Sequence, residues 1–361
     1  MLRMILAFAL LASPALAERL NTSAGPVEVV PVVSGLDTPW AVAFLPDGGY
    51  LITERDGVLW RTDATGQRQA VDGLPEVRAR GQGGLLDVVL DPGFTDNGML
   101  YLSYSEPVGI RSARTAVARA RLDGLFLRDL QVIFRQEPEQ TGGRHFGSRI
   151  VPDDAGGLYV TLGERGEADL AQSTEHDMGK VVRINADGSP RDNGAFAGKG
   201  HLWSIGHRNP QGAALDETGQ LWTVSHGARG GDEVNRPEAG KNYGWPVITY
   251  GVSYAGFQIG EGTHKDGMEQ PMWYWDPSIA PSGMTIYSGK LWPDWAGDIF
   301  VGSLKFDLIS RLDRNGDSIA GEEQLFQGRF GRIRDVREGP DGALWFLAEA
   351  NGTLYRVTPA E

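Results

Sequence analysis

A short pattern recurs along the chain and limits the folds that it can adopt. A turn glycine is followed each time by an apolar, often aromatic-bearing strand, and the six copies lie at residues 48–52, 98–102, 156–160, 219–223, 297–301 and 342–346. A second element follows most copies, in which an apolar strand runs through arginine into an Asp, Asn or Gly turn, at residues 59–66, 117–124, 181–188 and 309–316. Each repeat therefore predicts a β-hairpin within a small sheet.

These repeats predict an all-β fold, a six-bladed β-propeller. A lone antiparallel sheet of this size exposes an apolar face and two edges, whereas radial stacking of several sheets covers the faces. The 50 Gly and 20 Pro suit many turns, and helix-type spacing of apolar residues is hard to find. A β-sandwich of ordinary hairpins is the alternative, but sandwiches rarely keep a full-blade period. The uneven spacing of the copies predicts loops of very different lengths, which should carry the function.

The N-terminus indicates export. Arg3 supplies a positive charge, Met4 to Ala12 form a short apolar run, and Ala15-Leu16-Ala17 is typical of a cleavage site. That run is too short to span a bilayer, and no later stretch is apolar enough to do so. We therefore expect a signal peptide over residues 1–17, no membrane span, and a single propeller domain over residues 18–361. The chain has no cysteine, which excludes disulfides and lipid anchors on cysteine.

The charge of the chain narrows the class of ligand. A formal net charge of −13 opposes a general nucleic-acid or anionic-membrane surface, because a phosphate polyanion would be repelled over most approaches. No nucleic acid is therefore expected as a partner, and a small ligand is favoured. Basic residues that cluster locally become the more informative ones.

Four glycine-rich segments hold more polar residues than strands need, and each belongs to a different repeat. They span residues 80–87, 142–149, 206–212 and 226–235. Corresponding loops of successive blades converge on one end of a propeller channel, so these residues could face one ligand. Lys305, Arg332 and Arg334 add positive charge from the last two blades. Arg332 and Arg334 are two residues apart, hence on the same face of an extended strand.

Each of these signals is weak when taken alone. His145 could be a packed or surface histidine, and the cationic side chains could be solvated or paired with carboxylates. Asp232 and Glu233 could simply end a turn. Together, the cations suit a rigid polyanion, a carbonyl-rich loop with acidic residues suits Ca²⁺, and one histidine can accept a proton. No Walker loop, Rossmann fingerprint, H-E-x-x-H or G-x-S-x-G motif competes.

At these residues the chain resembles the soluble PQQ sugar dehydrogenases, especially their aldose sugar dehydrogenase branch from the Gram-negative periplasm. The matching motifs run over residues 36–40, 80–90, 145–149, 208–212, 226–246 and 332–341. The resemblance is nearly full length. It implies a periplasmic six-bladed propeller that holds pyrroloquinoline quinone (PQQ) at one end of its channel, with Ca²⁺ bridging cofactor and protein.

Carried over position by position, the resemblance implies three groups of site residues. The catalytic group is His145 as general base, Glu164 as the acid that orients it, and Arg208 facing the reactive carbonyl. The residues implied to bind PQQ are Gln82, His145, Arg208, Asn209, Tyr254, Lys305, Arg332 and Arg334. The residues implied to bind calcium are Gly227 and Ala228 through their carbonyls beside PQQ, with Glu233 and the Tyr243 carbonyl at another position.

The reaction implied is oxidation of the anomeric C1–OH of an aldose to a lactone, with hydride passing to the quinone. His145 must be neutral to take the hydroxyl proton, and Arg208 and Ca²⁺ would favour that form. Electrons would then pass to an unidentified acceptor, either a soluble periplasmic carrier or a quinone. Ala228 stands where glucose-specific members carry proline, and the loops are shorter than in their dimeric branch, so a monomer is expected.

Two other functions remain open at this point. A calcium-dependent propeller lactonase would share the metal and the channel but would hydrolyse lactones without PQQ. A non-catalytic propeller would bind a sugar or a partner, since the fold alone assigns no function. The lactonase gives no reason for Lys305, Arg332 and Arg334 to converge, and the non-catalytic propeller would bind sugar without reducing a dye after PQQ and Ca²⁺ are added.

Overall fold

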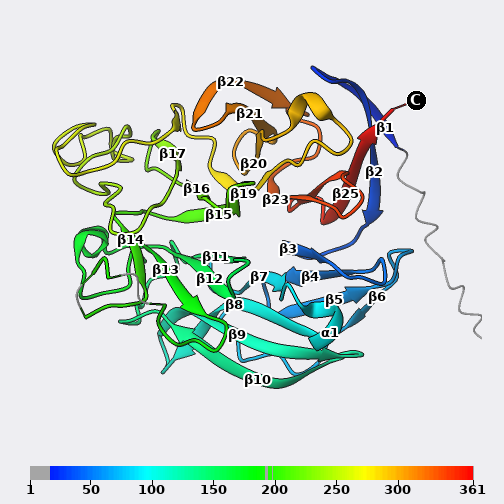
Figure 1. Ribbon diagram of the computed structural model, residues 1–361, viewed down its shortest axis with the longest axis horizontal. Helices are drawn as coiled ribbons and strands as arrows, with labels where there is room; N and C mark the ends of the chain where they lie inside the picture. Colours follow the sequence, from blue (N-terminus) through cyan, green and yellow to red (C-terminus); the bar gives the residue numbers. More distant parts are fainter. Residues whose placement is uncertain (1–16, 192–193, 197, 361) are drawn as a thin grey trace, which may run out of the picture.

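The computed structural model describes residues 17–191, 194–196 and 198–360, whose strands form six antiparallel sheets arranged in a ring (Figure 1). The predicted six-bladed β-propeller is therefore confirmed. The predicted signal peptide lies outside these residues apart from Ala17, and β1 begins at Glu18. The short helical segments are α1 (Phe94–Asn97), η1 (Ala168–Gln172) and η2 (Pro293–Trp295). Within the described ranges, no helix is long and apolar enough to cross a membrane.

Blades 1 to 6 follow the order of the chain, and the strands of each blade are named from the innermost to the outermost. Blade 1 consists of β3 (Pro39–Phe44), β4 (Tyr50–Glu54), β5 (Val58–Thr62) and β6 (Arg68–Ala70). Blade 2 consists of β7 (Leu85–Leu90), β8 (Met99–Val108), β9 (Ser112–Asp123) and β10 (Phe126–Arg135). Blade 3 consists of β11 (Gly147–Pro152), β12 (Gly157–Leu162), β13 (Lys180–Asn185) and β14 (Leu202–Ile205). Blade 4 consists of β15 (Pro210–Leu215), β16 (Leu221–Ser225), β17 (Asp232–Asn235) and β18 (Trp273–Trp275). Blade 5 consists of β19 (Pro281–Ile286), β20 (Ile299–Ser303), β21 (Ile309–Asn315) and β22 (Ser318–Leu325). Blade 6 consists of β23 (Ile333–Glu338), β24 (Leu344–Ala348), β25 (Thr353–Pro359), β2 (Gly25–Val33) and β1 (Glu18–Thr22).

The sequence repeats correspond to fixed places in the blades. The six glycine-led copies become the second strands, β4, β8, β12, β16, β20 and β24, and the arginine-bearing copies become the third strands β5, β9, β13 and β21. The second and third strands of a blade pair antiparallel, as the predicted hairpins require; in blade 3, for example, Tyr159 lies opposite Arg183. The loop after every second strand therefore emerges at one common end of the ring.

The ring is closed by both ends of the chain. Strand β2 pairs antiparallel with β25, so the sixth sheet joins N-terminal strands to C-terminal ones (Figure 1). Pairing Val29 with Val357 satisfies main-chain groups that would otherwise form a free edge beside β25.

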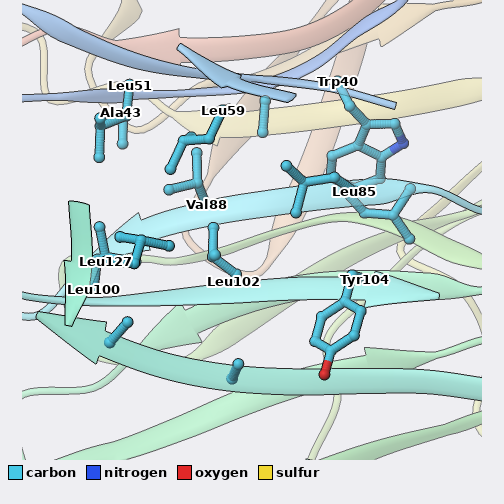
Figure 2. Packing of buried hydrophobic residues seen from close by; sticks show 14 of the residues in the cluster. Trp40, Ala43, Leu51, Leu59, Leu85, Val88, Leu100, Leu102, Tyr104 and Leu127 are labelled. Atoms are coloured by element: carbon cyan, nitrogen blue, oxygen red, sulfur yellow. The ribbon is translucent and has the colours of Figure 1, made fainter. Parts of the chain in front are cut away.

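The core consists of six apolar clusters, each of which lies between two neighbouring blades of the described chain. The cluster between blades 1 and 2 is drawn in Figure 2, where Trp40 and Leu59 lie opposite Leu85 and Val88. Covering both faces of every sheet in this way removes apolar surface from water and fixes the blades relative to one another.

Charged residues occupy the channel between the inner strands. Arg149 of β11 is only 1% exposed and lies 3.0 Å from Asp87 and 3.2 Å from Asp335, measured from Nη1 to carboxylate oxygens. Arg337 pairs with the same two aspartates at 2.9 Å each. The guanidinium of Arg149 also lies 4.3 Å from the ring centroid of Trp40. These contacts tie blades 2, 3 and 6 together across the axis.

Replacing Arg149 with Met should lower the free energy of unfolding by about 3–5 kcal/mol, because it leaves buried carboxylates short of a cation. Denaturant unfolding of the purified protein measures this. The control is Arg61→Met, whose half-exposed pair with Asp47 should contribute no more than about 1 kcal/mol. Equal losses in the two variants would show that the channel pairs do not hold the ring together.

Candidate functional site

Two adjoining cavities mark one end of the channel. The larger, of about 770 Å³, is lined by His226 to Gly230, Tyr254, Asp276 to Ser278, Ala280, Leu304, Lys305 and Arg332. The smaller, of about 170 Å³, is lined by Trp40, Arg55, Gln82, Gln211, Arg334 and Glu349 together with His226, Ala280, Leu304 and Arg332. These residues come from the first residues of inner strands, from loops between blades, from loops that follow second strands, and from the long β17–β18 loop. The uneven loops expected to carry function thus meet at a single mouth.

His145 is held beside this mouth by two side chains. Its ring Nδ1 lies 2.8 Å from Glu164 Oε1, and its backbone N–H donates to Gln82 Oε1 at 2.6 Å. The backbone of His145 has a φ of 54°, and a Cβ on Gly163 would lie 1.9 Å from the His145 carbonyl oxygen. Glycine at 163 is therefore needed for the close approach that positions the imidazole.

Burial and hydrogen bonding together determine the pKa of His145 and which ring nitrogen carries its proton. Burial lowers the pKa of His145, the hydrogen bond to Glu164 acts in the opposite direction, and the charge of Arg208 lowers the pKa further. Burial alone would raise the pKa of Glu164, but the hydrogen bond and charge of His145, the hydrogen bond from the Gly166 N–H and the charge of Arg208 together hold that pKa below its usual range. An ionised Glu164 can only accept, so Nδ1 carries the ring proton and the lone pair is on Nε2.

Arg208 and Asn209 lie at the start of β15, next to His145. Arg208 donates to the carbonyl oxygens of Gly227 and, at 3.4 Å, His226, and its guanidinium lies 5.2 Å from the Trp245 ring centroid. Asn209 Oδ1 accepts the Gly147 N–H at 3.1 Å, which fixes the segment that carries the imidazole. Arg208 Nε and Asn209 Nδ2 are buried without a hydrogen-bond partner in the described chain, so both are donors available to a ligand.

The predicted cations line the cavities but differ in how far they are neutralised. Lys305 lines the larger cavity, with Nζ 4.8 Å from the Phe306 ring centroid. Arg334 donates to Glu349 at 2.7 Å and to Gln211 at 3.0 Å, while Arg332 lies 3.8 Å from Glu349. Burial would raise the pKa of Glu349, but Arg334 and Arg332 hold it below its usual range. Glu349 therefore balances part of the charge of the two arginines.

The carbonyl-bearing loop is braced by Asp232. Gly227 donates its N–H to Asp232 Oδ1 at 2.7 Å, and the other carboxylate oxygen accepts from Ser278 Oγ at 2.6 Å and Ala280 N at 2.8 Å. Gly227 and Ala228, whose carbonyls are the predicted calcium ligands, both line the larger cavity. Asp232 thus does more than end a turn, because it joins the two loops on either side of that cavity.

The remaining predicted ligands lie in blade 4, in strand β17 and in the long loop that joins it to β18. Glu233 has Asn235 Nδ2 at 3.0 Å as its side-chain partner, and burial raises its pKa to about 7. The Tyr243 ring stacks on His207 at 4.9 Å, and its hydroxyl accepts from Glu238 N at 3.0 Å. Tyr254 lines the larger cavity while remaining largely exposed. Within the described ranges there is no cluster of three or more His, Asp or Glu side chains suited to a metal.

Several lining residues received no individual role in the sequence reasoning, although Gln211 and His226 lie in two of its polar segments. They are Arg55, Gln211, His226, Asp276 and Glu349. The repeat held a signal for three of them, because Arg55, His226 and Glu349 each follow directly after a second strand, as Leu304 also does. His226 is the most informative, since it lines both cavities and its buried Nε2 has no hydrogen-bond partner in the described chain.

Comparisons with known proteins agree with this architecture. The sequence profile of the Glucose / Sorbosone dehydrogenase family matches residues 36–356. The chain is 44% identical over 336 residues to the aldose sugar dehydrogenase YliI of Escherichia coli, covering 90% of this chain and 91% of the relative. The crystal structure of the soluble aldose sugar dehydrogenase from Escherichia coli in its apo form is 43% identical and superposes with a TM-score of 0.89, covering 92% of this chain and all of that one. A PQQ-bound aldose sugar dehydrogenase from Streptomyces coelicolor is 28% identical with a TM-score of 0.77, covering 92% and 98%.

Glu164→Gln should lower the pKa of His145 further, because the carboxylate that stabilises the imidazolium is removed while the burial remains. NMR titration of the imidazole protons in both proteins tests this. Glu167→Gln, an exposed change in the same loop, should leave the titration of His145 where it was. A rise in the His145 pKa in Glu164→Gln would contradict the hydrogen-bond geometry.

Proposed function

We propose, because the chain belongs to the glucose/sorbosone dehydrogenase family, that it is a PQQ-dependent aldose sugar dehydrogenase that oxidises the anomeric C1–OH of an aldose to a lactone. The observation that carries the proposal is a neutral, oriented imidazole next to a cation-lined cavity. A base and an anion site that adjoin one another suit an oxidation in which a proton and a hydride leave the same carbinol.

The residues present fit PQQ. The larger cavity has room for a small polycyclic ligand, and Arg229, Lys305 and Arg332 on its wall suit the carboxylates of that ligand. Buried donors and acceptors without partners, Arg208 Nε and His226 Nε2, are the groups that a bound ligand would satisfy. The set of residues that would bind PQQ is completed by Gln82, Asn209, Tyr254 and Arg334. When bound, PQQ supplies the two-electron acceptor that no side chain of the protein can provide.

The residues also fit a calcium ion, on the chemistry of the donors. The carbonyls of Gly227 and Ala228 are hard oxygen ligands on the wall of the cavity, held in place by Asp232. Glu233 is a carboxylate whose pKa burial raises to about 7 and whose side-chain partner is an amide, so a cation shared with the Tyr243 carbonyl would stabilise its charged form.

The protein's own contribution to the reaction is orientation, charge and one proton transfer. His145 Nε2 would accept the C1 hydroxyl proton of the sugar, and Glu164 would stabilise the imidazolium that forms. Arg208, held against the Gly227 carbonyl, would supply positive charge to stabilise negative charge on the oxidant. Tyr254, exposed at the mouth, would provide an aromatic surface for the sugar and cofactor.

The proposal includes export to the periplasm. It is supported by the charged, apolar and small-residue segments before Glu18, and by a first strand that starts at Glu18 and is needed in the sixth sheet. Expressed from its own start codon in a Gram-negative host, the mature protein should be recovered from the periplasm with Glu18 as its first residue. N-terminal sequencing tests this, and an intact Met1 on periplasmic or cytoplasmic protein would oppose it.

The test of the function is reconstitution. Apoprotein titrated with PQQ and Ca²⁺ should reduce an artificial electron acceptor when aldoses are added, and removal of Ca²⁺ with a chelator should abolish turnover. A screen of monosaccharides and disaccharides then identifies the substrate. Lactone hydrolysis without PQQ would indicate a lactonase instead, and sugar binding without dye reduction would indicate a non-catalytic propeller.

His145→Ala should reduce kcat by about two to four orders of magnitude, the usual contribution of a general base, while PQQ binding followed by absorbance stays largely intact. The matched control is His264→Ala, an exposed histidine, which should behave as wild type. Near-normal turnover of His145→Ala would remove this residue from the mechanism.

A further inference from the structure

The mouth of the channel is flanked by a group of arginines that the proposed reaction does not use. This arginine patch consists of Arg78, Arg80, Arg111 and Arg144. The first three line one shallow hollow together with Gly142, Gly143 and Phe146. Arg144 adjoins that hollow and precedes His145 in the chain. The patch therefore joins loops of blades 2 and 3 at the end of the ring that carries the site.

The charge of the patch is not balanced locally. None of its four arginines forms a salt bridge with a carboxylate in the described chain, although Glu76 and Glu139 lie on the same loops. The chain as a whole has a formal net charge of −13, so the patch is opposite in sign to the chain's overall charge. Unpaired arginines on an acidic protein favour approach by a negatively charged surface from one direction only.

An exposed aliphatic side chain lies within the patch and is held there by it. Ile110, at the tip of the β8–β9 hairpin, is 94% exposed. Arg78 donates to the carbonyl oxygens of Gly109 at 2.8 Å and Ile110 at 2.9 Å, which fixes the tip. An exposed apolar residue that is held by Arg78 and precedes Arg111 matches the composition of protein interfaces, in which arginine is enriched beside apolar contacts.

The patch lies next to the site without being part of the ligand cavities. Gln82 donates its N–H to the Gly143 carbonyl oxygen at 2.7 Å, so the loop that touches His145 also borders the patch. None of the four arginines lines either cavity. Capture of a small anionic ligand in the cavity therefore does not account for them.

We propose that the arginine patch with Ile110 is the docking surface for the electron acceptor, and that this acceptor is a soluble one-electron redox protein with an acidic face. The inference rests on the proposed function, which supplies two electrons per turnover. Oxidation of one aldose to its lactone releases two electrons and two protons. Two ferric haem proteins would each take one electron in succession, and the protons would pass to solvent.

The probes are two forms of cytochrome c that share one haem, the native basic protein and its succinylated acidic derivative. Holoenzyme reduced by aldose is mixed with each ferric form and haem reduction is followed by absorbance. The acidic form should react at least about tenfold faster at low ionic strength, and salt should erase the difference. Arg80→Gln/Arg111→Gln should slow the acidic form about three- to tenfold. The control Arg121→Gln/Arg128→Gln, on the outer strands of the same blade, removes the same charge and should change the rate less than about twofold.

Two outcomes would overturn the docking surface: equal rates with both cytochromes, or equal effects of the patch and control variants. Failure of the proposed function is seen separately, as no reduction of a neutral dye by any aldose. In that case binding of succinylated cytochrome c to immobilised apoprotein still decides the inference. Binding that the patch variant weakens and the control does not supports it, and binding unaffected by Arg80 and Arg111 refutes it.

Discussion

Closure of the ring is the constraint on which the rest of the structure depends. Each sheet has two apolar faces, and only neighbours on both sides can cover them, so six inter-blade clusters require six sheets and a join between the ends of the chain. Strand β2 makes that join with β25, and the ion pairs of Arg149 hold facing inner strands across the channel. A closed ring gives loops from every blade one shared mouth, and so allows residues far apart in sequence to act on one ligand.

Burial assigns different roles to similar groups at that mouth. It keeps His145 neutral and able to accept a proton, whereas Glu164, which is also enclosed, stays ionised because it accepts hydrogen bonds from the imidazole and the Gly166 N–H and lies near Arg208. The same loss of solvent raises the pKa of Glu233, whose side chain pairs with an amide and not with a cation. Enclosure from water thus produces a base, an anion and a carboxylate suited to a cation, each set by its immediate neighbours. Outside the cavity the arginines of the patch remain solvated, and their positive charge instead favours encounter with the proposed acidic partner protein.

The sequence predicted the blades well because their signal is local. A turn glycine before an apolar strand appears six times, and β4, β8, β12, β16, β20 and β24 follow it. It predicted the cationic and histidine-bearing segments, but their individual partners less well. Glu349 is one residue after a strand and looks like any surface carboxylate, yet it pairs with Arg334. Asp232 had the sequence signature of a turn, and its hydrogen bonds to Ser278 and Ala280 depend on a neighbouring loop that is distant along the chain.

The sequence by itself determined the number of blades, the hairpins within them and which segments bear polar residues, because period and turn chemistry act over a few neighbouring residues. Only the tertiary structure decided which side chains meet. That Nδ1 of His145 faces Glu164, that Arg332 and Arg334 share one carboxylate, and that Arg78 holds the hairpin tip carrying an exposed isoleucine are consequences of how far each blade is rotated about the axis. That rotation is fixed by packing between sheets, and no stretch of sequence encodes it locally.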